Sequence, residues 1–146
     1  MKTFMARFPA VLAIAALLTL TGCPPIEQNA RDTAATAQGF INQAQQDHLA
    51  ECQANPTKAW PCAYINQAIG AQNLLIDAIE QYCGWPSRPG ADALKQYAGQ
   101  ACVANKGALQ HLQSSINSIN SIMADYKQAA AAPCAPGVGL CIGGAK

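Results

Sequence analysis

The sequence has little charge and few aromatic side chains. Only 12% of its 146 residues are charged and 6% are aromatic. The nine Lys and Arg residues nearly balance the eight Asp and Glu residues, and they do not cluster along the chain. Because binding to nucleic acid depends on clustered Lys and Arg, we expect no nucleic-acid partner.

Motifs typical of catalysis and metal binding are also missing. No two cysteines have the Cys-x-x-Cys spacing of redox motifs or zinc knuckles. His111 is expected on an exposed helical face, without a carboxylate close in sequence, so it is poorly placed to activate a nucleophile. His48 lies near Asp47, Glu51 and Cys52, but a cysteine in a disulfide offers no thiolate to a metal. We therefore predict a protein that is not an enzyme, with no catalytic residue, no metal site and no cofactor.

The N-terminal region lacks the length of a membrane-spanning helix. Its predominantly apolar run, residues 10–20, has 11 residues, whereas a spanning helix needs roughly 20. Lys2 and Arg7 precede the run, as in a secretory signal peptide. The run ends in Leu-Thr-Gly-Cys at Cys23, which resembles the lipobox of bacterial lipoproteins. An ordinary signal peptide that happens to be cleaved near a cysteine is the alternative.

The resemblance to lipoproteins implies how the chain is anchored. Residues 1–22 would be the signal peptide, and residues 23–26 a short tether with lipid, including palmitate, on Cys23. Two or more acyl chains anchor a protein stably, since each buried methylene contributes about 0.8 kcal/mol. Pro24 is not the aspartate associated with inner-membrane retention in enteric bacteria, so the outer membrane is favoured if the host has one. The domain would then face the periplasm or the cell surface.

Three segments carry apolar residues at spacings of three and four, which is typical of helices. The first covers residues 26–52 and precedes a break at residues 55–57. The second begins near Pro61 and ends before the Gly- and Pro-rich residues 84–90. The third follows one heptad seam, formed by Cys102, Leu109, Leu112, Ile116, Ile119, Met123, Tyr126 and Ala130. No segment shows convincing strand alternation.

The sequence therefore predicts an all-α fold, an antiparallel three-helix bundle over residues 27–132. A short extra helical segment is expected at residues 91–101, before the last helix. Residues 133–146 would form a Gly- and Pro-rich tail closed by a disulfide. We call the end of the bundle nearest Cys23 the lower end and the opposite end the upper end. The first helix then rises, the second descends and the third rises again.

Six cysteines remain beside Cys23, and an even number in an exported chain is typical of a disulfide framework. Cys83 belongs at the lower end, roughly 30 Å from Cys62 along the second helix. Only Cys102 is then within disulfide reach of Cys83. The other four belong at the upper end, where we favour the local pairs over two crossed pairings, namely Cys52–Cys62 and Cys134–Cys141.

The helical register predicts three finer features. Gly39 is expected opposite Leu75, where a close approach of the first two helices would offset the roughly 1 kcal/mol cost of a helical glycine. A merely tolerated glycine is the alternative. Asp77 and Glu80 are expected on an exposed strip between the apolar seams. The outer face of the third helix is expected to be uncharged and to include Ser115.

The aromatic residues suggest the contact surfaces. Trp85 and Arg88 are expected at the lower end, and tryptophan and arginine favour membrane interfaces and anionic head groups. The alternative is that Trp85 caps the core. Trp60 is expected at the upper end, which points away from the bilayer and is accessible to a partner.

These expectations lead to a lipid-anchored cell-envelope protein whose helical domain is a protein-interaction or scaffold module with an envelope protein as its partner. An inhibitor or exclusion lipoprotein that blocks an incoming enzyme or a conjugation apparatus is the alternative. A carrier of small ligands would need a cavity of several hundred Å³, for which an alanine-rich core leaves little room.

Lipid attachment gives the first prediction. The Cys23→Ser variant should be unprocessed or soluble, because serine has no thiol to which lipid can be attached. Detergent phase separation and alkaline washing of membranes measure the difference. A Cys23→Ser protein that partitions with membranes like the wild type would show that lipid on this residue is not the anchor.

Overall fold

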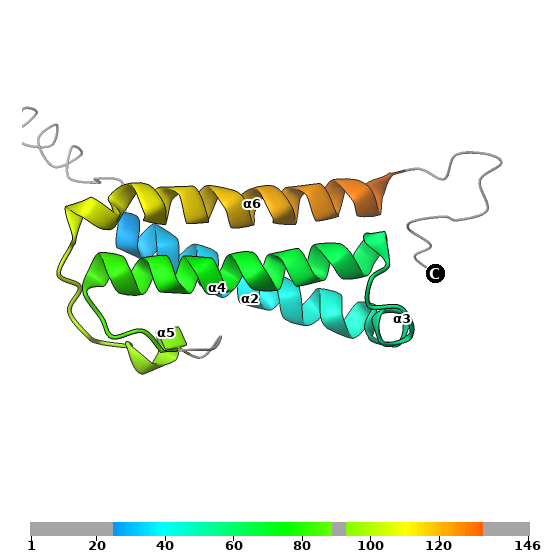
Figure 1. Ribbon diagram of the computed structural model, residues 1–146, viewed down its shortest axis with the longest axis horizontal. Helices are drawn as coiled ribbons and strands as arrows, with labels where there is room; N and C mark the ends of the chain where they lie inside the picture. Colours follow the sequence, from blue (N-terminus) through cyan, green and yellow to red (C-terminus); the bar gives the residue numbers. More distant parts are fainter. Residues whose placement is uncertain (1–24, 89–92, 133–146) are drawn as a thin grey trace, which may run out of the picture.

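The computed structural model describes residues 25–88 and 93–132, which form three long helices and several short helical segments (Figure 1). The long helices are α2 (Ile26–Asp47), α4 (Tyr64–Cys83) and α6 (Leu109–Ala131). The short segments are α3 (Leu49–Ala54), η2 (Ala59–Ala63), α5 (Ala93–Gln96) and η3 (Lys106–Ala108).

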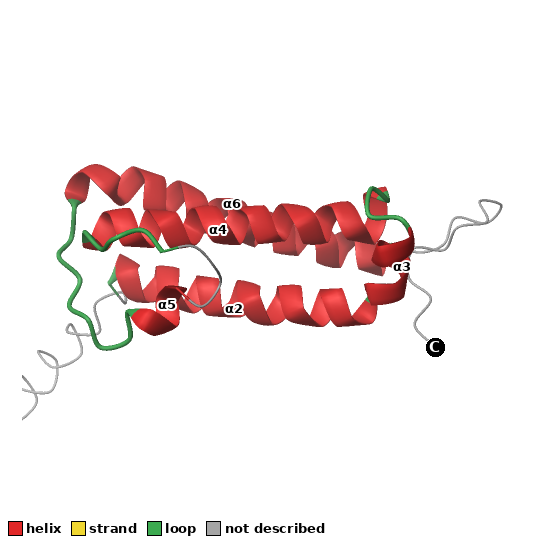
Figure 2. Cartoon of the chain, turned by 60° about the horizontal axis from the view of Figure 1, so that its bottom comes forward, coloured by secondary structure: helices red, strands yellow, loops and turns green. Residues whose placement is uncertain are grey.

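The long helices alternate in direction. In Figure 1 the lower end of the bundle is on the left. There α2 and α6 run from left to right, whereas α4, which lies between them in the sequence, runs from right to left. Packing of α4 against both α2 and α6 brings the three together, and Figure 2 shows the same elongated bundle from another side. The predicted antiparallel three-helix bundle is confirmed, and α5 supplies the short helical segment before the last helix. Within the described ranges, the helices are too short or too polar to cross a membrane.

The first helical segment is interrupted near the upper end, whereas the sequence pattern predicts one helix over residues 26–52. α2 stops at Asp47 and α3 begins at Leu49. His48 between them has a φ of −120° and a ψ of 17°, although its N–H still donates to the last turn of α2. Figure 1 shows α3 turned away from the axis of α2. This change of direction brings Cys52 to its disulfide partner at the start of the next helix.

Alanine dominates the seam between the long helices. The buried core includes alanines from α2 and α4, namely Ala30, Ala34, Ala37, Ala68, Ala71 and Ala78. Larger apolar side chains complete it, namely Ile41, Leu75, Ile79, Leu112, Ile116 and Ile119. Small side chains allow close helix packing, but each removes little apolar area from water.

The last helix begins later than the heptad seam predicts. α6 starts at Leu109, and Cys102 belongs to an extended segment, residues 101–105, that precedes it. In this segment the N–H groups of Val103 and Asn105 donate to the last carbonyls of α4 at 3.4 and 2.7 Å. Those carbonyls have no partner within their own helix, which explains why the segment stays extended. Asn105 then accepts an N–H from η3 and caps the start of the last helical region.

The rest of the seam is confirmed in its middle, where Leu112, Ile116, Ile119 and Met123 are buried. Towards the upper end Tyr126 is half-buried and Ala130 is exposed. Ser115, which the register assigned to the outer face, is buried. The reason is that α6 packs against both α4 and α2, so its buried face is wider than a single seam.

Gly39 does not mark a close approach of two helices. It is exposed, and a Cβ atom added at this position would meet no neighbour within 4 Å. Gly70 has the same open surroundings, while Leu75 lies in the core. The predicted contact between Gly39 and Leu75 is therefore wrong, and the alanines mediate the helix packing instead.

Disulfides close both ends of the bundle, as predicted. Cys52–Cys62 lies at the upper end with a Cα–Cα distance of 5.4 Å, and Cys83–Cys102 lies at the lower end with 4.5 Å. Both distances are normal for disulfides. Cys23, the predicted signal peptide and the predicted Cys134–Cys141 pair lie outside the described residues.

The core of α6 gives a stability prediction with a matched control. Ile119 is fully buried, so Ile119→Asp should cost several kcal/mol of unfolding free energy by placing a carboxylate among apolar side chains. Asn120 is the exposed next residue, and Asn120→Asp should cost little. Denaturant unfolding of both variants measures the difference, and equal destabilisation would contradict the register of α6.

Candidate functional site

The three side chains predicted as contact residues lie at opposite ends of the bundle. Trp85 and Arg88 follow α4 at the lower end, and Trp60 precedes α4 at the upper end. Both tryptophans are half-buried, and Arg88 is exposed. The structure therefore separates these residues into two clusters.

Trp85 is built into the lower end. Its ring stacks on Tyr97 with the ring centroids 4.5 Å apart, and its Nε1 donates to the Ala101 carbonyl at 3.1 Å. The guanidinium of Arg31 lies 4.5 Å from the centroid of the Trp85 ring and also pairs with Glu27 at 2.9 Å. Trp85 thus caps the bundle, and its indole N–H is bonded within the protein.

Glu80 is the polar centre of the lower end, and the prediction that it is exposed is wrong. Its side chain is 1% exposed. It accepts the backbone N–H of Arg88 at 3.1 and 3.3 Å and lies 3.1 Å from the Tyr97 hydroxyl, which also contacts the Pro86 carbonyl. The register places Glu80 beside the apolar seam as expected, but residues 93–101, which we call the strap, cover this face of α4. Sequence periodicity within α4 does not reveal the strap.

Aromatic rings close the upper end. The ring of Tyr126 in α6 lies 4.4 Å from that of Trp60 and 4.8 Å from that of Phe40. Trp60 also contacts His48 at 6.1 Å and Tyr64 of α4 at 5.7 Å, measured between ring centroids. The Trp60 ring therefore contacts α4, α6 and the turn between α2 and α3.

A small charged group borders these rings. His48 Nδ1 lies 3.2 Å from Glu51 Oε2, and Lys58 forms an ion pair with the same carboxylate. The hydrogen bond from Lys58, with a smaller contribution from His48, lowers the pKa of Glu51. Burial raises the pKa of Tyr126, and nearby Asp47 raises it further.

A surface groove of about 440 Å³ opens at the upper end between α2, α3 and the start of α4. Five amide side chains line it, namely Asn42, Gln45, Gln46, Gln53 and Asn66. Its apolar surface comes from Leu49, Pro56, Ile65 and the Cys52–Cys62 disulfide. No charged or aromatic side chain is among these described lining residues. The groove therefore offers a surface that is open to a ligand or a partner.

Sequence reasoning missed this groove. Its only signal in the sequence is the amide-rich stretch at residues 42–46, and amides are equally typical of a solvated helix face. The groove depends on the turn at His48, which moves α3 off the axis of α2 beside the disulfide. Helical periodicity alone does not predict that turn.

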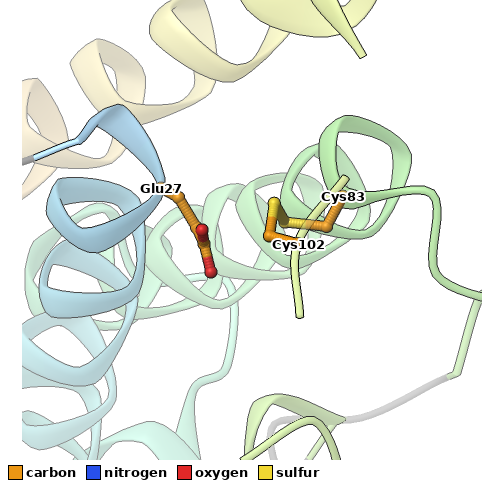
Figure 3. Close-up of side chains that lie close together, drawn as sticks. All are labelled: Glu27, Cys83 and Cys102. Carbon is orange, nitrogen blue, oxygen red and sulfur yellow. A yellow bond between two sulfur atoms is a disulfide. The ribbon is translucent and has the colours of Figure 1, made fainter. Parts of the chain in front are cut away.

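A group of side chains with metal-ligand chemistry occurs at the lower end, formed by Glu27, Cys83 and Cys102 (Figure 3). Their potential ligand atoms lie within 4.8 Å of one another. The two sulfur atoms are bonded to each other, however, and a disulfide sulfur lacks the negative charge of a metal-binding thiolate. The oxidised cluster is therefore unsuited to holding a metal ion.

Comparison of this chain with protein-family models, with curated proteins and with solved structures finds no match.

The lower cluster gives a prediction for alkaline pH. Burial raises the pKa of Tyr97 above its usual value near 10.0, and Glu80 adds to the effect. The folded protein then holds the tyrosine proton more tightly than the unfolded chain does. The free energy of unfolding should therefore fall as the pH rises above the usual tyrosine pKa and through the raised pKa of Tyr97. Thermal melting of the wild type and of Tyr97→Phe measures the effect, which should be weaker in the variant. An equally steep loss of melting temperature in both proteins would contradict the prediction.

Proposed function

We propose that this chain is a lipid-anchored protein of the cell envelope whose helical domain presents a protein-interaction surface at its upper end. The proposal combines the resemblance of residues 1–23 to lipoprotein signals with the placement of the groove. One observation carries it: α2 begins at Ile26, three residues after Cys23, whereas the groove lies at the opposite end of the same helix.

This arrangement sets the distance between the anchor and the groove. α2 has 22 residues, so it spans roughly 33 Å at 1.5 Å per residue. The tether between Cys23 and α2 reaches only about 10 Å when it is extended. Lipid on Cys23 would therefore keep the lower end close to the bilayer and hold the upper end well away from it. A partner would meet the groove and the exposed part of Trp60 first.

The form of the groove favours a protein partner over a carried small ligand. Carriers enclose most of the ligand surface in a largely apolar pocket. Here the core is filled by the alanine seam, and the groove lies outside the core between helix ends. An inhibitor or exclusion lipoprotein would use the same surface and would differ in the identity of its partner.

Site-specific photo-crosslinking in cells tests the proposal. A photoreactive amino acid at Gln46, an exposed groove residue of α2, should capture an envelope protein. The same amino acid at Asn29, an exposed residue near the lower end of α2, is the matched control and should not capture that protein. Mass spectrometry of the crosslinked bands identifies what is bound.

Two results would contradict the proposal. The first is the absence of a protein adduct at Gln46, and the second is the same adduct at Gln46 and Asn29. Capture of an incoming enzyme or of a conjugation component would favour the inhibitor alternative over the scaffold. Repeating the experiment with Cys23→Ser separates the role of the anchor from that of the surface.

A further inference from the structure

The groove lies at the upper end of one continuous face of α2. On α2, Arg31, Gln38 and Gln45 are spaced by seven residues and therefore share one face. Arg31 lies over Trp85 at the lower end, Gln38 pairs with α4 in the middle, and Gln45 lines the groove. Figure 1 shows α5 and α6 on opposite sides of α4, so the strap and the bundle partner α6 occupy different faces.

On α4, too, some residues contact the strap and others line the groove. Ile76 packs with Tyr97 of the strap, Gln72 lies one turn above, and Ile65 lines the groove. Gln72 Nε2 donates to Gln38 Oε1 at 2.8 Å and so bridges α4 and α2 between the strap and the groove. Lower on α4, Ile76 and Glu80 are thus already covered by a segment of the chain itself, the strap. The groove, to which α2 and α4 contribute Gln45 and Ile65, lies closer to the upper end than the Gln38–Gln72 bridge.

The amide side chains that line the groove have free hydrogen-bonding capacity. The amides of Gln45, Gln46, Gln53 and Asn66 make no hydrogen bond to another residue in the described part of the chain. Each amide offers both donors and an acceptor. Beside them Leu49 is 56% exposed. The groove therefore combines neutral donors and acceptors with a lining whose surface is mostly apolar.

This chemistry distinguishes among ligand classes. Nucleic acids and other polyanions need cationic side chains, and the groove lining has none. Sugar rings stack on aromatic side chains, which the lining also lacks. An acyl chain would bury the amides without hydrogen-bond partners, which is unfavourable. A peptide main chain matches best, because every residue other than proline carries one donor and one acceptor.

We propose that the groove binds an uncharged, extended peptide segment of the partner protein, above the part of α4 that the strap covers. This inference rests on the proposed function and specifies what the interaction surface recognises. The amides bond the peptide main chain, while Leu49 and Ile65 contact a small apolar side chain of the peptide.

Selection from a library of short random displayed peptides tests the inference on the full chain in detergent. Peptides poor in Asp, Glu, Lys and Arg should be enriched. Leu49→Asp should weaken their binding at least about tenfold, because it places a charge in the neutral groove. Leu74 is the matched control, since it is 57% exposed on α4 and does not line the groove. Leu74→Asp should bind the peptides like the wild type.

A second variant covers the case in which Leu49→Asp disturbs folding. Asn66→Trp fills the groove from α4 and should also abolish binding, while circular dichroism checks that both variants stay helical. Failure to enrich any peptide, equal binding to wild type and Asn66→Trp, or enrichment of charged peptides would overturn the inference. Displacement of the peptides by chitotriose or by laurate would assign the groove to a glycan or an acyl chain and would also overturn it.

The two proposals fail in different ways. Peptide selection uses purified protein and does not depend on lipid attachment or on the envelope. Capture at Gln46 in cells that persists unchanged with Leu49→Asp would leave the interaction surface intact and refute the peptide groove. Enriched peptides without any capture in cells would support the peptide groove and contradict the proposed interaction surface.

Discussion

The three long helices meet along a seam of alanine side chains, and the rest of the structure is organised around this constraint. Alanine lets helix backbones approach closely, but each side chain buries little apolar area, so the middle of the bundle gains less from the hydrophobic effect than a leucine-rich core. The two ends of the bundle compensate for this smaller gain. Each end carries a disulfide, which contributes about 2–4 kcal/mol, and a tryptophan packed among other rings. The disulfides and the tryptophans thus stabilise the bundle where its helices begin and end.

The lower end adds a buried carboxylate to this scheme. A buried charge is unfavourable unless it is hydrogen-bonded, and Glu80 obtains its partners from the chain that follows α4. Gly84 makes this possible, because its φ of 67° reverses the chain and lets the N–H of Trp85 donate to the Glu80 carbonyl at 2.9 Å. The strap is thereby fixed over the lower half of α4.

Sequence periodicity and chain geometry predict the bundle, the order of its helices and the Cys83–Cys102 bond, because these follow from helix length and the position of turns. The burial of Glu80 and the open surroundings of Gly39 are missed, since both depend on segments that approach from elsewhere in the chain. The extended segment at Cys102 is missed for a related reason. Its apolar spacing continues the heptad pattern, but the carbonyls at the end of α4 and the Asn105 cap outweigh that pattern.

The groove connects the two parts of the proposed function, which are export with a lipid anchor and binding of a protein partner. One of its walls is the Cys52–Cys62 disulfide, which also joins α3 to η2, just before α4. Disulfides persist in the periplasm and on the cell surface and are rare in the reducing cytosol. The proposed export would therefore provide both the compartment in which the groove keeps its shape and the anchor that sets its distance from the membrane. A groove built on a disulfide at the end opposite the tether is suited to a partner that is met outside the cytosol.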